Sequence, residues 1–420
     1  DAKRNIQSIF GMIQLGWKNL IYADITARNE WSSTLANTSS KNTGFFYPSI
    51  GFSWIANQAI KLPEWINFYK FRLSWAQVGN DLPIGITSPS PTITAGGMIK
   101  QVQYDFDNLR PEISTSWELG MECKLLSSRI NIDLTIYRTN TKNQLLYIKT
   151  PTGKYPYKYF NAGKIQNQGV ELSLGITPLI TNSWSWKTDL NYSTNKNKVI
   201  SLGDNSAFDY GTGVNMPYRM RVKEGGALGD IYGNDFSRDS AGKILVTPTG
   251  LPKVNTGNYS FIGNANPNYL LGLSNTLAYK GIHIYALIDG AIGGHVISLT
   301  QSALDLRGVS KKSGEARDRG YVEVEGQKYT DVEGFYSIVA NRSDGCTSYY
   351  RYNRTNIRLR ELSIGYSIPQ SLLVKGNIFK NIEISLIAQN LFFLYKDAPF
   401  DPDGVLSVAN NNQGVDIFGM

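Results

Sequence analysis

Apolar and polar residues alternate with a period of two in segment after segment of this chain. In residues 21–28 the odd positions are apolar, and the even positions, among them Asp24 and Arg28, are mostly polar. Successive side chains of an extended strand point to opposite faces, so each such segment predicts a strand with one apolar and one polar face. A soluble sandwich would bury the apolar face against protein, whereas an outer-membrane barrel would turn it to lipid and its polar face to a lumen.

The pattern predicts about twelve strands of roughly ten residues, the length that a tilted strand needs to cross a bilayer. They fall in residues 7–16, 20–28, 44–54, 70–81, 113–126, 129–140, 169–177, 183–195, 269–279, 282–290, 357–368 and 382–393. Two of them are irregular. Pro48 cannot donate a ladder hydrogen bond and therefore requires an edge, a bulge or the rim of its strand. The apolar phase shifts after Leu359, which predicts a β-bulge near Arg360–Glu361.

The connections between these segments alternate between short and long. The short ones are 17–19, 57–67, 126–128, 178–183, 280–281 and 369–380, and the long ones are 29–43, 79–112, 139–168, 195–268, 292–356 and everything after Phe393. A soluble sandwich has no reason to place every long loop at one end, whereas an outer-membrane barrel has short periplasmic turns and long external loops. The fold class predicted is therefore all-β, an antiparallel transmembrane β-barrel.

Composition agrees with an all-β chain and excludes other classes. The 420 residues include 25 Tyr and 40 Gly, and no stretch of about 18 apolar residues could form a membrane-spanning helix. The net charge of +8 is spread along the chain, so we expect no nucleic-acid partner. Cys123 falls on an apolar strand phase, and a plain buried or lipid-facing thiol is favoured over a disulfide with Cys346. The first residues contain no apolar leader, which favours an internal piece of a longer exported protein.

Several segments, taken together and in this order, resemble one known family. They are "LRPEISTSWELGMECKLLSSRINIDLTIYRTNTKNQLL" (109–146), "NAGKIQNQGVELSLGITPL" (161–179), "KFRLSWAQVGND" (70–81), "GNANPNYLLGLSNTLAYKGIHIYALIDGAIGG" (263–294), "LRELSIGYSIPQSLL" (359–373) and "AQNLFFLYKDAPFDPD" (388–403). The chain resembles the barrel of SusC-like TonB-dependent transporters of Bacteroidetes over nearly its whole length.

The resemblance implies a large plugged barrel of about 22 strands in the bacterial outer membrane. Residues 1–420 are expected to form its C-terminal part, with the plug, the TonB box and the final strand outside the chain. Such proteins import glycans, and sometimes peptides, with energy from TonB and under a SusD-like surface lipoprotein. A passive porin or surface-adhesin barrel and a soluble secreted glycan-binding protein are the alternatives.

The residues themselves suggest binding rather than catalysis, and we expect no enzyme activity, cofactor or metal. Neither His283 nor His295 belongs to a metal-ligand pattern, and "DPDG" (401–404) lacks the spacing of a calcium loop and is interpreted as a turn. Aromatic and polar residues on long loops could stack on sugar rings and bond their hydroxyls. These substrate-binding candidates are Trp31, Tyr104, Asp105, Phe106, Asp107, Asn108, Tyr349, Tyr350 and Arg351. Packing between loops or against the lid is the competing interpretation.

Strand phase selects a second set of candidates that would face the lumen and hold the plug. They are Asp24, Arg28, Arg72, Glu118, Glu122 and Asp133, for which ordinary solvated lumen charge is the alternative.

Overall fold

The computed structural model describes most of the chain, and within it two compact units can be separated. The described residues are 3–38, 44–87, 92–93, 99–100, 104–106, 109–149, 157–161, 163–203, 207–210, 216–369, 373, 379, 381–405 and 413–416. Unit 1 comprises Asp1–Asp204, Tyr269–Gly290 and Ile357–Leu394, and unit 2 comprises Asn205–Asn268, Ala291–Asn356 and Tyr395–Met420.

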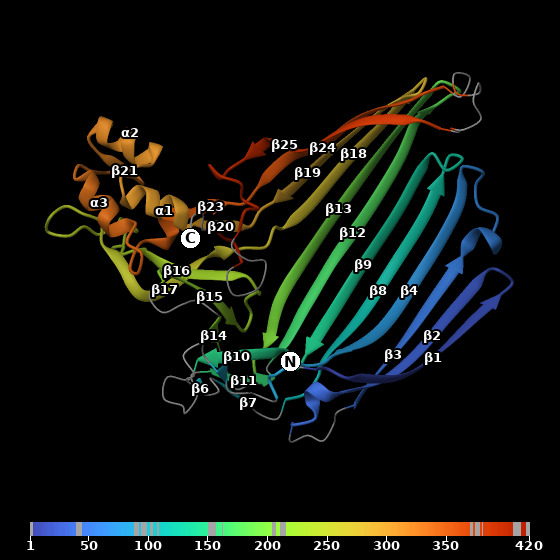
Figure 1. Cartoon of the computed structure of the whole chain (residues 1–420), viewed down its shortest axis with the longest axis horizontal. Helices are drawn as coiled ribbons and strands as arrows, with labels where there is room; N and C mark the ends of the chain where they lie inside the picture. Colours follow the sequence, from blue (N-terminus) through green and yellow to red (C-terminus); the bar gives the residue numbers. More distant parts are fainter. Residues whose placement is uncertain are drawn as a thin grey trace. The chain divides into compact units, whose positions relative to one another are not determined.

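Unit 1 is dominated by one sheet of twelve strands. Its neighbours follow the chain in the order β1-β2-β3-β4-β8-β9-β12-β13-β18-β19-β24-β25, and they run side by side from blue β1 to red β25 in Figure 1. The strands are β1 (Ile6–Trp17), β2 (Ile21–Ser32), β3 (Gly44–Ile55), β4 (Ile66–Asn80), β8 (Glu112–Leu125), β9 (Ile130–Lys142), β12 (Lys164–Ile180), β13 (Trp184–Ser201), β18 (Tyr269–Tyr279), β19 (Ile282–Ile292), β24 (Asn356–Ser367) and β25 (Glu383–Lys396). The twelve predicted strands are therefore confirmed. Because β1 and β25 are its two edges, the sheet of this chain is an open wall and not a closed cylinder.

The two predicted irregularities have structural counterparts. Pro48 pairs with Ala27 of β2, and the register between β3 and β4 begins only at Ser49, so the proline lies where that pairing ends. In β24, Arg360 bonds to Asp289 of β19, and Ser367 bonds to His283 of β19. The two β19 residues are six apart and share a face, whereas their β24 partners are seven apart, so the β24 side chains change face between Arg360 and Ser367, as a β-bulge would cause.

Short elements of unit 1 lie in the long connections. They are η1 (Ser33–Leu35), β5 (Thr92–Ile93), β6 (Ile99–Lys100), β7 (Tyr104–Phe106), β10 (Leu145–Lys149) and β11 (Tyr157–Asn161), while η2 (Ala56–Gln58) lies in a short connection. Beside them, Leu35, Leu82 and Leu109 form a small buried cluster. The buried carboxylate of Asp81 accepts two hydrogen bonds from Arg4, of 2.6 and 3.0 Å, which ties the start of β1 to the end of β4.

Unit 2 is a compact α+β body built from three of the long connections. Its four-stranded sheet contains β14 (Ala207–Tyr210), β15 (Tyr218–Lys223), β16 (Asp230–Phe236) and β17 (Val254–Asn264), and β20 (His295–Ser298) pairs with β23 (Arg351–Asn353) and β26 (Val415–Asp416). Its other elements are α1 (Leu299–Leu306), α2 (Lys311–Arg319), β21 (Val322–Val324), β22 (Gln327–Tyr329), α3 (Val332–Val339) and η3 (Thr347–Tyr350). Tyr218, Ile231 and Phe335 lie at the centre of its hydrophobic core.

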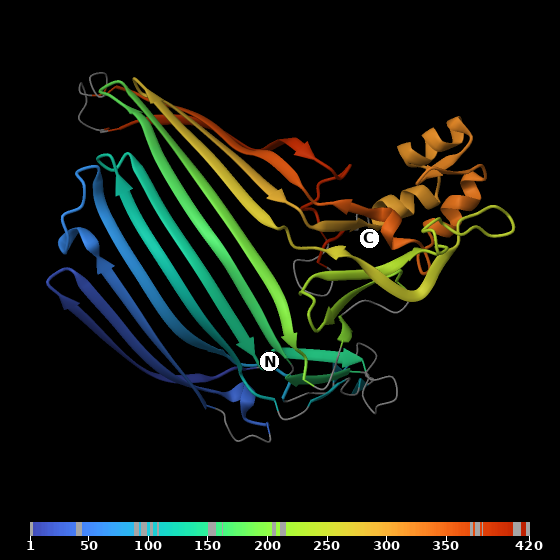
Figure 2. The same cartoon turned by 180° about the vertical axis from the view of Figure 1, so that it is seen from behind.

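Each helix of unit 2 begins at a side chain that caps it. Ser298, Ser310 and Asp331 accept hydrogen bonds from the backbone N–H groups of Gln301, Ser313 and Gly334, which satisfies donors that a helix N-terminus leaves free. None of the helices in the described residues has the length and apolar character needed to cross a membrane. Figure 2 shows the same elements from behind.

Candidate functional site

The apolar side chains of the large sheet form continuous rows on one of its faces. One row, which we call the apolar row, crosses seven strands through Leu15, Ala23, Phe52, Leu73, Leu119, Ile136 and Val170. Leu15, Phe52, Leu73, Leu119 and Ile136 are each 39% to 57% exposed. A sandwich would cover these side chains with a second sheet, whereas a membrane barrel leaves them to the lipid. The exposed row therefore excludes the sandwich for this sheet.

Aromatic side chains mark both ends of this apolar face. Trp184 stacks on Tyr279 with ring centroids 4.1 Å apart near the short turns, and Tyr192 stacks on Tyr269 at 5.8 Å toward the long connections. Tyr269 and Tyr279 are the first and last residues of β18. Ten residues at about 3.3 Å each, tilted by about 45°, span about 23 Å, close to the height of an outer-membrane apolar band. The two aromatic pairs thus have the spacing of interfacial girdles.

The opposite face, the polar face, carries a cluster of charges around Arg72. The Arg72 guanidinium donates to both carboxylate oxygens of Asp133, at 2.7 and 3.2 Å, and lies 3.7 Å from Glu122. To reach β9 from β4, the side chain crosses β8 over Gly120, where an added Cβ would lie 2.8 Å from the Arg72 Nε. The glycine therefore makes room for an ion pair between strands that are not neighbours.

A second side chain crosses a glycine in the same way, between β9 and β13. Tyr137 lies across Gly169 of β12, where a Cβ would be 2.6 Å from its hydroxyl, and donates to the Asn195 Oδ1 at 3.3 Å. Each crossing links three strands on the polar face, β4, β8 and β9 in the first case and β9, β12 and β13 in the second.

An uncharged row lies on the polar face closer to the long connections. This hydroxyl row runs through Thr26, Ser49, Ala76, Ser116, Thr139, Asn167 and Asn197. The hydroxyls of Thr26 and Ser49 are 2.6 Å apart, and those of Ser116 and Thr139 are 2.8 Å apart. The row offers donors and acceptors without fixed charge.

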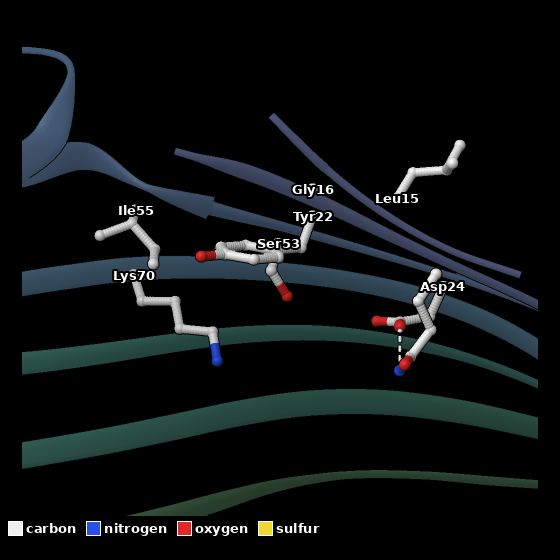
Figure 3. A pocket seen from close by; sticks show the side chains of 8 residues that line it. Leu15, Gly16, Tyr22, Asp24, Ser53, Ile55 and Lys70 are labelled. Carbon is white, nitrogen blue, oxygen red and sulfur yellow. Dashed lines mark hydrogen bonds between the residues drawn. The ribbon is translucent and has the colours of Figure 1, made fainter. Parts of the chain in front are cut away.

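An open pocket of about 640 Å³ lies at the short-turn end of β1–β4. Figure 3 shows Tyr22, Ser53 and Lys70 directed to the polar side of the sheet and Leu15 directed to the other side. Asp24 accepts a hydrogen bond of 2.9 Å from the Gln14 side chain at the pocket edge. The pocket therefore combines an amine, a phenol, a hydroxyl and a carboxylate on one wall.

A second charged group lies on β19 and β24. Asp289 accepts from Arg360 at 2.7 Å, and Arg360 also donates to the Asn390 Oδ1 of β25 at 2.9 Å. The His283 Nε2 lies 3.0 Å from the Ser367 hydroxyl, and His283 shares the strand phase of Asp289. These contacts link β19, β24 and β25.

Sequence and structure comparisons show where this two-faced sheet belongs. Residues 1–289 match the family model described as "TonB dependent receptor-like, beta-barrel". The chain belongs to the TonB-dependent receptor family. It is therefore a protein of the bacterial outer membrane, as the sequence resemblance predicted.

The curated relatives are of the same family. The chain is 25% identical to TonB-dependent receptor P3 of Formosa agariphila, over 97% of this chain and 43% of that protein. It is 22% identical to TonB-dependent receptor SusC of Bacteroides thetaiotaomicron, over 96% of this chain and 42% of that protein. The chain thus spans less than half the length of these relatives. A structure of the RagAB peptide transporter has a TM-score of 0.74 at 17% identity, covering 98% of this chain and 45% of that one, and shows that the fold is shared.

The residues predicted to face the lumen of this TonB-dependent receptor lie on the polar face. Arg72, Glu122 and Asp133 form the charge cluster, and Asp24 borders the short-turn pocket. The Arg28 guanidinium pairs with Glu30 and donates to the Ser8 hydroxyl at 3.2 Å, and Glu118 lies in register between Ser74 and Tyr137. The structure brings three of the six together, and their contact with a plug stays a prediction.

The candidates on long connections are dispersed. Trp31 lies near the end of β2 and is 40% exposed, with its ring over Gly44. Tyr104, Asp105 and Phe106 form β7, which pairs in parallel with β11, whereas Asp107 and Asn108 lie outside the described residues. The backbone contacts of β7 suit the alternative of packing between loops.

The candidates in unit 2 differ in exposure: Tyr350 is buried, Tyr349 is half-buried and Arg351 is exposed. Tyr350 is 3% exposed, and its hydroxyl donates to the buried Asp305 at 3.1 Å, so it contributes to the core and not to an open surface. Burial raises the pKa of both Tyr349 and Tyr350 above the usual range, which keeps their hydroxyls protonated. Arg351 donates to the carbonyl of Ile262 at 3.0 Å. The burial of Tyr350 suits the alternative of internal packing, and the substrate contacts of Tyr349 and Arg351 stay predictions.

Some polar-face residues were not among the candidates. Tyr22 and Lys70 share the strand phase of Asp24 and Arg72, and Asp289 shares that of His283, so phase alone could have selected them. Cys123 is a free, buried thiol, as predicted, and Cys346 is also free and buried. Asp401–Gly404 closes with a hydrogen bond from the Gly404 N–H to the Asp401 carbonyl at 3.1 Å, which agrees with the predicted turn. In the part of the chain that the structure describes, no three His, Cys, Asp or Glu side chains gather as a metal site.

Proposed function

We propose that the protein imports an oligosaccharide across the outer membrane by a TonB-dependent route, under a SusD-like surface lipoprotein. The observation that supports this most is the pairing of a lipid-exposed apolar face with a hydrogen-bonded polar face in one sheet. Only a membrane wall with a polar interior requires both at once. We propose no catalytic step and no cofactor, because binding and passage are what this wall supports.

The hydroxyl row supports an oligosaccharide as the substrate class. Sugars present neutral donors and acceptors, which Ser, Thr and Asn side chains match without the cost of desolvating a charge. Between Thr26 and Asn197 this row carries no charged side chain. Charged side chains lie in the neighbouring rows on both sides, Asp24 and Glu118 toward the short turns and Arg28 toward the long connections.

Family relationships support the energy source and the partner. The relatives are TonB-dependent receptors, and one of them is SusC. Peptide import is the second candidate, because the chain shares the fold of the RagAB peptide transporter. Peptide import would use the same two-faced sheet and would differ from oligosaccharide import only in the substrate.

Deletion of the gene in its native host tests the proposal. We expect loss of growth on specific oligosaccharides, unchanged growth on peptides, and the same loss when TonB is deleted. Uptake that continues without TonB would contradict the energy-coupled route and favour a passive pore. Loss of peptide growth alone would contradict the glycan assignment.

A variant pair then tests the hydroxyl row in full-length protein. Replacing Ser116 and Thr139 by Val removes two hydroxyls from the polar face. Each lost hydrogen bond of about 0.5–1.5 kcal/mol slows uptake about 2- to 10-fold if the sugar contacts them. The control is Thr188→Val, which removes a hydroxyl that donates to Asn275 at 2.7 Å on the opposite face and should leave uptake unchanged.

A further inference from the structure

Two turns at the short-connection edge of the sheet share an uncommon backbone and a lysine. Lys18 and Asn19 have φ of 51° and 53°, and Lys280 and Gly281 have φ of 46° and 89°. Two consecutive positive φ values are typical of type I′ hairpin turns, whose twist matches that of the strands. Lysine is not a residue that favours this backbone, so its presence at the first position of both turns requires another reason.

In each turn the lysine follows an aromatic residue and folds back over it. The Lys18 Nζ lies 4.8 Å from the ring centroid of Trp17, and the Lys280 Nζ lies 5.3 Å from that of Tyr279. Both distances are within the range of a cation–π contact. Trp17 is 54% exposed on the apolar face, and Tyr279 stacks on Trp184 there. Each ammonium is therefore held at the border between apolar face and water.

The described turns of the short-connection edge carry a net positive charge. The described turns 18–20, 56–65, 126–129, 181–183 and 280–281 contain four cations, Lys18, Lys61, Arg129 and Lys280, and one anion, Glu64, for a net charge of +3. In the part of the chain described by the structure, no carboxylate lies within 4.0 Å of these four cations. Among the described residues, these four cations are therefore not in contact with a counter-charge.

We propose that Trp17–Lys18 and Tyr279–Lys280 are two binding sites for the phosphodiester headgroups of phospholipids in the leaflet at the short-turn end. The ring lies among the acyl chains near the interface, and the ammonium extends to the phosphate layer. A lipid phosphate is the occupant that fits, because each ring belongs to the lipid-exposed face, where a soluble partner has no access. The proposal depends on the placement of the sheet in the membrane and not on the cargo.

Native mass spectrometry of the full-length protein, released from mixed phosphatidylglycerol and phosphatidylcholine nanodiscs, tests the sites. A basic residue at a membrane surface contributes on the order of fivefold to anionic-lipid affinity. We expect the Lys18→Gln/Lys280→Gln protein to lose up to two retained phosphatidylglycerol molecules, with about fivefold weaker binding at each site. Lys18→Arg/Lys280→Arg should retain both lipids.

The matched control is Lys243→Gln/Lys253→Gln, which removes two exposed lysines of unit 2 and should leave retention unchanged. Equal retention by the Lys18→Gln/Lys280→Gln protein and wild type would overturn the proposal. An equal loss in the control would show a general charge effect and would also overturn it. Because retention is measured without transport, failure of these sites is distinguishable from failure of the import function.

Discussion

The crossing of Arg72 over Gly120 gives a prediction with a defined magnitude. An alanine Cβ at position 120 would lie 2.8 Å from Nε and 3.0 Å from Nη2 of Arg72, closer than such contacts allow. The guanidinium must then move away from Asp133, to which it donates at 2.7 and 3.2 Å. Gly120→Ala therefore perturbs one ion pair and leaves the backbone pairing in place.

The expected loss of stability depends on how exposed the Arg72–Asp133 ion pair is to solvent. Hydrogen bonds to charged groups are worth about 1.5–3 kcal/mol when shielded. The Arg72 and Asp133 side chains are 32% and 43% exposed, so solvent screening reduces this to about 1 kcal/mol. Alanine itself gains about 0.5–1 kcal/mol over glycine in a strand. The comparison must therefore be made with a glycine on the same face whose Cβ meets no obstacle.

Gly51 supplies that control, because its added Cβ would lie 3.9 Å from the nearest side-chain atom, the Cβ of Asp24. We expect Gly120→Ala to be less stable than Gly51→Ala by about 1 kcal/mol, measured by guanidinium unfolding of the full-length protein in detergent and followed by tryptophan fluorescence. In an Asp133→Ala background the difference should disappear. Equal stability of the two alanine variants, or a difference that persists without Asp133, would refute the reasoning.

Three further predictions concern the apolar face and unit 2. Leu119→Arg in the apolar row should destabilise the folded barrel by about 2–4 kcal/mol in the same unfolding assay, whereas Ser74→Arg on the polar face should change it little. Burial lowers the pKa of His295 below 6.5, and the Arg351 charge lowers it further, so the unfolded chain takes up a proton that the native state does not. The unfolding free energy of unit 2 should therefore fall as the pH drops below about 6.5, and His295→Asn should flatten this dependence in pH-resolved hydrogen exchange. Burial raises the pKa of the Cys346 thiol to about 11, so iodoacetamide at pH 8 should label it only after unfolding, as read by mass spectrometry.

Strand existence and face could be predicted from the sequence because both depend on a local period of two. Strand ends could not be predicted as well. The predicted strand at 183–195 extends to Ser201, where polar residues replace the alternation and pairing with Gln166 and Asn167 of β12 maintains the extended chain. Local pattern carries no information about such neighbours.

Unit 2 was not predicted, because the long connections were interpreted as loops. Its helices are only eight or nine residues long, so each offers about two turns of helical period. Their stability comes from a core that joins residues far apart in sequence, such as Tyr218 and Phe335. The same limit explains Tyr350, whose partner Asp305 is 45 residues away.

Strand phase placed Arg72 and Asp133 on one face, and only the register shows that they touch. The contact joins residues that are 61 apart in sequence. It depends on the register in which β4, β8 and β9 pair and on the absence of a side chain at Gly120. Phase predicts which residues share a wall, whereas pairing across strands decides which of them form a site.

Spin-label accessibility at Leu134 and Asp133 tests most directly that this sheet has lipid on one side and a polar interior on the other. Each position is changed to cysteine in full-length protein whose Cys123 and Cys346 are replaced by serine, and the labelled protein is reconstituted in lipid. We predict that the label at Leu134 collides with oxygen dissolved in the bilayer and that the label at Asp133 does not. A label at Leu134 that meets a water-soluble relaxation agent, with the label at Asp133 in lipid, would contradict the account.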